Sequence, residues 1–239
     1  KTGVLPRSPI PDTRNPMNTY LEIGQKRVFA AALDWPGWCR GGRDEGAALR
    51  ALLDYAPRYA AVAKRAGIPF VPPDSTTAFS VIERLPGGAG TDFGAPEAIP
   101  SSDRQPLVSA ELIRIGALLA ACWAVYDAIA AAAGGVDLRK GPRGGGRELE
   151  GITRHVLGAG QGYLGRLAWK APKEETADLN EEMRLTRQAI MDALAAAEQG
   201  QIPERGPRGG VIWPARYFVR RVAWHVLDHA WEIADRSSP

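Results

Sequence analysis

The segment 224–233, WHVLDHAWEI, places His225 and His229 four residues apart in a stretch with helical character. Residues four apart on a helix share one face and lie one turn apart, so both imidazoles can reach the same ion. The face that carries the histidines continues through apolar residues: Phe218, Val222 and Ile233. The segment therefore predicts a core-facing helix that carries two metal ligands.

The third histidine of the chain, His155, falls in a second amphipathic segment at 147–169. It shares a stripe with Ile152, Ala159 and Tyr163, and this stripe is also expected to face a core. Taken alone, each histidine reads better as an ordinary buried or capping side chain. The joint placement of all three on the interior stripes of two helices favours a shared metal site.

Two further segments complete a set of four with helical character: 108–133, 147–169, 176–199 and 214–236. Glycine and proline occur in the connections between them, as expected where helices end. Four helices of this length predict a four-helix bundle.

The N-terminal part has a different pattern. Residues 20–33, interrupted at 24–26, predict two short strands joined by a tight turn. A helix is expected from about Asp44 to Ala66, with Pro57 able to kink it, and residues 79–85 predict another strand. These elements form a small β-β-α-β unit.

The predicted organisation is an α+β protein with two folded parts. Residues 1–18 are expected to be a flexible leader, 19–85 the small unit and 107–236 the bundle. Between them, 86–106 is rich in Pro, Gly, Ser and Asp and is expected to be a linker.

Composition limits the classes of protein that fit. The 239 residues are 45% hydrophobic and 24% charged, which is typical of a globular chain, and a net charge of +3 does not indicate nucleic-acid binding. No uncharged apolar run of roughly 18 residues and no secretory signal are recognised, and Cys39 and Cys122 form no disulfide framework. A cytoplasmic protein without membrane or nucleic-acid partners is expected.

Two resemblances extend this prediction. Residues 33–47, LDWPGWCRGGRDEGA, are similar to the strand, Pro-Gly turn and helix start of HicB-like antitoxin domains, and the likeness covers roughly 19–85. It implies two or three strands packed on a helix. Such a unit can act as a scaffold, as a toxin partner or as a dimerisation module, so a homodimer is one expected state.

The second resemblance is to the DinB-like superfamily. It is carried by RHVLGA at 154–159 and by the segment 224–233, and it covers roughly 107–236. Members have a four-helix bundle with one metal histidine on the second helix and a His-x3-His pair on the fourth, which implies His155, His225 and His229 as ligands. The resemblance also implies zinc, nickel or iron, and transfer or isomerisation with a low-molecular-weight thiol such as mycothiol or bacillithiol.

The chemistry of such a site follows from its ligands. Three neutral imidazoles leave a coordination position open, as in catalytic rather than structural zinc sites. A divalent metal stabilises a thiolate over a thiol and holds it beside an electrophile. Asp228 and Glu232 are candidates to orient a ligand ring or to move protons; the alternative is that both are solvated helix residues.

Several arginines are candidates for binding carboxylates of a thiol or a small anionic substrate: Arg143, Arg147, Arg208 and Arg220. Arg143 and Arg208 occur in matching GPRGG loops at 141–145 and 206–210, each of which precedes a histidine-bearing helix. These loops either face a shared ligand or are simply similar loops, and the arginines either bind substrate or form a solvated basic surface.

Whether the chain is an enzyme stays open at this point. A metal-dependent thiol transferase or isomerase acting on a small molecule is the first hypothesis. A hydrolase that activates water at the same metal is an alternative. Another is a regulatory or interaction protein in which the metal only stabilises the fold.

Overall fold

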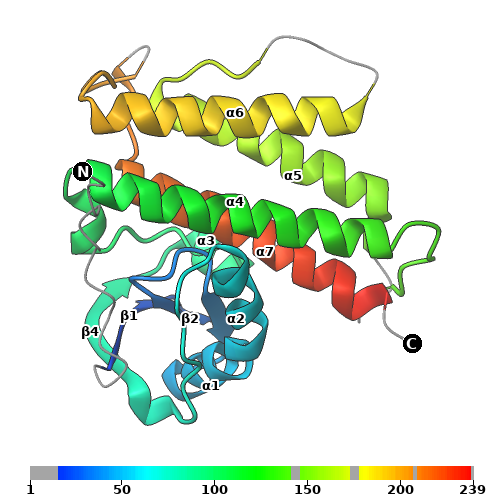
Figure 1. Cartoon of the computed structure of the whole chain (residues 1–239). Coiled ribbons are helices and arrows are strands. Elements are labelled where there is room, and N and C mark those ends of the chain that lie inside the picture. The colour runs from blue at the N-terminus through cyan, green and yellow to red at the C-terminus, as the bar shows by residue number, and fades with distance from the viewer. Residues whose placement is uncertain (1–15, 141–145, 173–177, 207–208, 238–239) are drawn as a thin grey trace, which may run out of the picture. The chain divides into compact units, whose positions relative to one another are not determined.

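The computed structural model describes residues 16–140, 146–172, 178–206 and 209–237 (Figure 1). The chain divides into two compact units, one containing the residues up to Ala98 and the other those from Ile99 onward, except that Trp35–Gly37 belong to the second. The first holds a four-stranded sheet and the second consists mainly of helices. The predicted α+β class is confirmed.

The sheet of the first unit has the strand order β3-β2-β1-β4. Its strands are β1 (Met17–Ile23), β2 (Val28–Ala32), β3 (Cys39–Gly42) and β4 (Phe79–Pro86). The first two pair antiparallel through a turn closed by the Gly24 amide donating to the Arg27 carbonyl at 2.9 Å. The last strand lies parallel to β1, which requires the intervening helices as a crossover.

The predicted β-β-α-β order was incomplete, because it lacked β3 and counted one helix where two exist. Residues 39–42 are CRGG, which carries neither the alternation nor the branched side chains that indicate a strand. The expected helix is divided at Tyr55 into α1 (Glu45–Asp54) and α2 (Ala56–Arg65). Pro57 sits in the first turn of α2, where a proline costs no helical hydrogen bond.

Trp38 organises the core of this unit. Its ring is fully buried and stacks on Tyr59 at 5.5 Å between centroids. The indole nitrogen donates to the Leu52 carbonyl at 2.9 Å, so the polar edge of the ring is satisfied. The same side chain therefore ties α1 and α2 to the residues beside β3.

Residues 86–106, for which a linker was predicted, contain the short helices α3 (Ala89–Phe93) and η2 (Ser101–Arg104). The buried Glu22 carboxylate of β1 accepts hydrogen bonds from Thr91 and from the amides of Glu97 and Ala98. These contacts hold residues 91–98 against the sheet.

The second unit contains four long helices that pack against one another in pairs. They are α4 (Ser109–Ala132), α5 (Leu149–Leu164), α6 (Leu179–Glu198) and α7 (Ala215–Ser237). All four fall within a few residues of the predicted segments. Helix α7 packs on α4 and α5, and α6 packs on α5 and α4, so the histidine-bearing helices α5 and α7 are direct neighbours.

By length and composition, α4 is the one helix among the described residues that is long and apolar enough to cross a membrane. Half of its most apolar window is buried inside the protein. Because the core helix of a soluble protein has the same properties, α4 does not distinguish the two cases.

Candidate metal site

The three histidines meet between α5 and α7. His155 comes from α5, and His225 and His229 come from successive turns of α7. Their potential ligand atoms all lie within 4.8 Å of one another, close enough to hold one metal ion. The ring centroids are 4.6 Å apart within α7 and 4.9 Å apart from His155 to each of the others.

The spacing of the ring nitrogens suits coordination. The Nε2 atoms of His155 and His225 are 3.2 Å apart. Two nitrogens bound tetrahedrally to zinc at about 2.0–2.1 Å would be separated by about 3.3 Å. The two nitrogens therefore already lie at a separation that one ion can bridge.

His229 is oriented by an acidic neighbour. Its Nδ1 lies 2.8 Å from Oε2 of Glu232, so the imidazole donates from Nδ1 and keeps the Nε2 lone pair for a metal. A carboxylate that fixes a ligand histidine in this way is a regular feature of metal sites. Of the two predicted acidic candidates, Glu232 has this contact, whereas Asp228 is half-buried on the same helix.

Arg236 fixes Glu232 in turn. Its Nη1 donates to Oε1 of Glu232 at 2.9 Å and to the carbonyl of Arg147 at 2.8 Å, while its Nε donates to the carbonyl of Arg139 at 2.7 Å. These bonds connect the end of α7 to two residues of the connection between α4 and α5. The position of Glu232 is thus set by backbone as well as by its own helix.

The electrostatics of the site favour the neutral forms of His225 and His155. Burial, together with the positive charge that His229 and His155 would carry, lowers the pKa of His225 to about 2. Burial also lowers the pKa of His155, and the His229 hydrogen bond lowers the pKa of Glu232. Neutral rings beside an ionised carboxylate are the protonation states that a divalent cation requires.

Replacing Glu232 tests its role in orienting His229. We expect Glu232→Ala to weaken metal binding by about 10- to 100-fold, because the imidazole loses the acceptor that fixes its tautomer and ring plane. Competition titration with a chromophoric chelator measures the affinity. The matched control is Glu181→Ala, which removes an exposed carboxylate paired with Arg184 on α6; an equal loss of affinity in both variants would contradict the role of Glu232.

The metal-free protein is expected to lose stability below pH 6.5. In the unfolded chain His225 takes up a proton near its ordinary pKa of 6.5, whereas in the folded protein it stays neutral down to about 2. The unfolded state therefore binds more protons in this window, and the free energy of unfolding falls by about 1.4 kcal/mol per pH unit for this group. Above pH 7 this contribution is constant.

Urea unfolding of the chelator-treated protein at pH 7, 6 and 5 measures this dependence. His225→Asn removes the titrating ring, so the variant should show a flatter profile between pH 5 and 6.5. Parallel profiles for the two proteins would exclude His225 as the source of the acid sensitivity.

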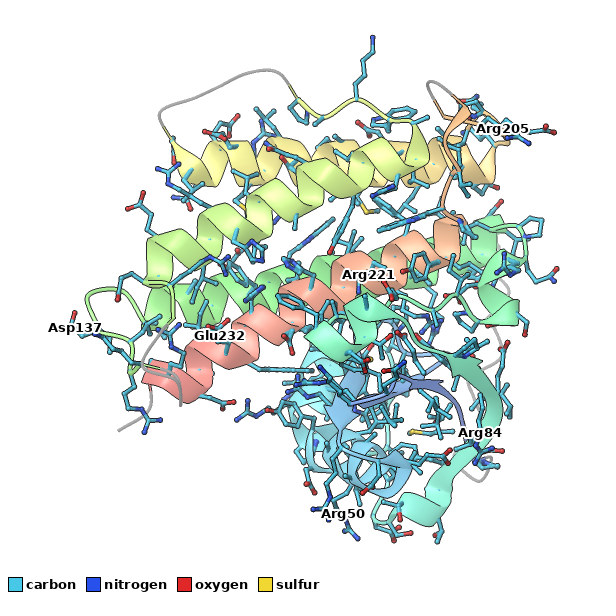
Figure 2. All side chains as sticks on the ribbon, turned by 180° about the vertical axis from the view of Figure 1, so that it is seen from behind. Arg50, Arg84, Asp137, Arg205, Arg221 and Glu232 are labelled. Carbon is cyan, nitrogen blue, oxygen red and sulfur yellow. The ribbon has the colours of Figure 1, made fainter. Side chains whose placement is uncertain are left out.

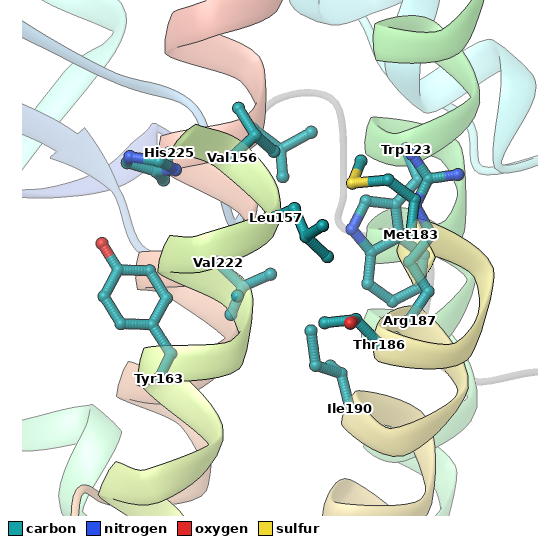
Figure 3. Close-up of a pocket in the computed structure, with 12 residues that line it drawn as sticks. Trp123, Val156, Leu157, Tyr163, Met183, Thr186, Arg187, Ile190, Val222 and His225 are labelled. Atoms are coloured by element: carbon teal, nitrogen blue, oxygen red, sulfur yellow. The ribbon is translucent and has the colours of Figure 1, made fainter. Parts of the chain in front are cut away.

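A second pair of side chains, not predicted from the sequence as site residues, lies beside the histidines. Tyr163 of α5 packs edge-on against His225 at 5.9 Å between ring centroids, and its hydroxyl is directed toward that ring (Figure 3). Arg221 of α7 donates from Nη2 to the Tyr163 hydroxyl at 3.3 Å and lies over the ring of Trp224. Its positive charge contributes to the lowered pKa of His225.

A small cavity of about 20 Å³ extends from His225 and Tyr163 into the interior between the helices (Figure 3). Its walls are mainly apolar, and this volume has room for about one water molecule. The Oγ1 atom of Thr186, which is 3% exposed, lines it without a hydrogen-bond partner among the described residues. His225 is thus bordered on this side by packed protein.

The arginines predicted to bind substrate differ in their surroundings. Arg147 is exposed at the start of α5, and its charge lowers the pKa of both His155 and His225. Arg220 is instead buried in an ion pair with Asp103, which two hydrogen bonds of 2.8 Å join, and is not part of a solvated surface. Arg143 and Arg208, with the comparison of their two loops, lie outside the described residues.

Both cysteines are buried and unbonded to each other. Burial raises the pKa of the Cys122 thiol, which agrees with its interpretation as a core residue rather than a nucleophile.

The chain matches no model of a known protein family, and comparisons with curated proteins and with solved structures find no match. The resemblances to DinB-like and HicB-like proteins therefore stay predictions from motifs. The geometry of the histidine site is the feature of this chain that indicates a function.

Proposed function

We propose that this protein is a metalloprotein that binds one divalent metal ion through His155, His225 and His229 and uses it for chemistry on a small molecule. The observation that carries the proposal is the convergence of three imidazoles from two helices, one of them oriented by Glu232. Structural zinc sites are normally closed by four protein ligands. A three-histidine site leaves room for an exogenous ligand.

The reaction that this site suits is transfer or isomerisation with a low-molecular-weight thiol, as the DinB-like resemblance implies. Three neutral histidines leave the full charge of a divalent ion available to stabilise a thiolate. Zinc, nickel and iron(II) all accept imidazole ligands, so the bound metal must be identified by measurement. The role of this chain's own residues is to hold the three rings in place and to keep His155 and His225 neutral.

Elemental analysis of the purified protein tests metal binding. We expect about one ion per chain after loading with zinc, nickel or iron(II) in separate samples and removal of excess. Absence of a stoichiometric metal under all three conditions would contradict the proposal and favour the interaction protein.

Activity assays then separate the two metal chemistries. The loaded protein should transfer a small thiol to an electrophile at a rate that falls on chelation and returns on reloading. Turnover of esters or amides without added thiol would instead favour the hydrolase.

A further inference from the structure

We propose that Tyr163 and Arg221 form an anion-binding subsite beside the metal position, so that the preferred ligand carries a carboxylate in addition to the group that coordinates the metal. This inference rests on the proposed function, because it concerns the ligand that the metal would hold. It adds a substrate class, a short thiol with a carboxylate, and assigns two residues to recognising it.

Helix geometry places the pair next to the histidines. Arg221 precedes His225 by four residues on α7, and Tyr163 follows His155 by eight residues on α5, so each lies on the face of its helix that carries a histidine. The contacts agree with this register, since Tyr163 packs against the His225 ring and Arg221 donates a hydrogen bond to the Tyr163 hydroxyl. Figure 2 shows Arg221 and Glu232 at separate positions along α7.

The chemistry of the pair suits a carboxylate. A guanidinium offers several N–H donors in one plane, and one of them reaches the phenol at 3.3 Å. A phenol hydroxyl can donate a further hydrogen bond to the same anion. Charge-assisted hydrogen bonds of this kind are about twice as strong as neutral ones.

The surroundings hold the two side chains in place. The Arg221 guanidinium lies 4.9 Å from the centroid of Trp224 and 5.7 Å from that of Tyr163, so it stacks on aromatic faces. On its other side Tyr163 packs against Trp213 at 5.4 Å. Aromatic packing restricts the rotamers of both residues, which lowers the entropy lost when a ligand binds.

The two ends of the site then have different roles. Glu232 and Arg236 at one end fix His229, while Tyr163 and Arg221 lie toward the opposite end of α7 from them. A ligand that coordinates the metal and extends toward Tyr163 meets donors and positive charge. Extension toward Glu232 would instead bring an anionic ligand against a carboxylate.

Cobalt(II)-loaded protein provides a test, because the cobalt spectrum reports the metal site and a sulfur-to-cobalt charge-transfer band reports thiolate binding. The two probes are 3-mercaptopropionate and 3-mercapto-1-propanol, which share a thiol and a spacer and differ in the carboxylate. We expect the wild-type protein to bind the carboxylate probe about tenfold or more tightly than the alcohol. Arg221→Gln should remove this preference, because the affinity for the carboxylate probe falls more than that for the alcohol, and Tyr163→Phe should reduce it.

The matched control is Arg154→Gln, which removes an exposed arginine of α5 that is paired with Glu150. It should keep the wild-type preference. Equal affinities of the two probes for the cobalt protein, or a preference that survives Arg221→Gln, would overturn the subsite and leave the metal site standing. Failure of the wild-type protein to bind cobalt would overturn both the proposed function and this subsite.

Discussion

His225→Ala is expected to abolish stoichiometric metal binding, with a loss of affinity of at least two to three orders of magnitude. Structural zinc sites with four ligands contribute about 10–16 kcal/mol, which corresponds to about 2.5–4 kcal/mol for each ligand, or about two to three orders of magnitude in affinity. His225 is the most buried of the three histidines, at 8% exposed, and its Nε2 lies 3.2 Å from that of His155. Elemental analysis and chelator competition on the purified variant measure the loss.

Folding has to be checked separately, because the substitution also empties space in the interior. His225→Asn fills more of this space and keeps a polar group, and it should lose the metal as His225→Ala does. His155→Ala and His229→Ala are expected to give the same result from less buried positions. Retention of one tightly bound ion in any of the folded variants would exclude a three-histidine site.

The helices and the convergence of the three histidines could be predicted because both depend on periodicity. A turn of 3.6 residues puts His225 and His229 on one face, and the apolar stripes of α5 and α7 specify which faces meet. The helical spacing of apolar residues also predicted the segments that form α4 and α6. His155 was expected to lie near His225 and His229 because the apolar stripes of α5 and α7 were both expected to face the same core.

Elements held by tertiary contacts were harder to predict. Strand β3 exists because β2 offers an edge to Cys39–Gly42, although this segment has weak intrinsic preference for a strand. Glu22 binds residues of the predicted linker through their backbone amides. Every residue except proline has such an amide, so the amino-acid composition of the segment does not reveal these contacts. The pair of Arg220 and Asp103 joins residues 117 apart in sequence, so no local pattern could connect them.

Roles within the site divide in the same way. Glu232 lies three residues after His229, a spacing that brings two side chains together on a helix and made it a candidate from sequence. Tyr163 and Arg221 are 58 residues apart and lie on different helices, so their pairing was not predicted. Tyr163 had been placed only on the interior stripe of α5. A search for donors one or two turns from each histidine would have found both.

Arg220→Met is expected to destabilise the protein by about 3–5 kcal/mol, because it leaves the Asp103 carboxylate buried without its cation. The side chains of Arg220 and Asp103 are 7% and 2% exposed, and two bonds of 2.8 Å join them. Urea unfolding measures the change. The sequence suggested substrate binding for Arg220, whereas a buried pair predicts an effect on the free energy of unfolding.

The double variant Arg220→Met with Asp103→Leu distinguishes the loss of a partner from the loss of packing. Replacing a whole buried ion pair by apolar side chains of similar volume is often neutral or stabilising, so the double variant should recover most of the stability lost in Arg220→Met. Arg216→Met, one turn earlier on α7, breaks a pair with Glu111 whose side chains are 25% and 26% exposed. It also removes hydrogen bonds to the carbonyls of Gln105 and Pro106, and it should cost about 1–2 kcal/mol. A large loss of stability in Arg220→Met that the double variant reverses identifies Arg220 as a structural residue. If Arg220→Met is instead as stable as Arg216→Met, and its affinity for 3-mercaptopropionate falls, then Arg220 takes part in ligand binding.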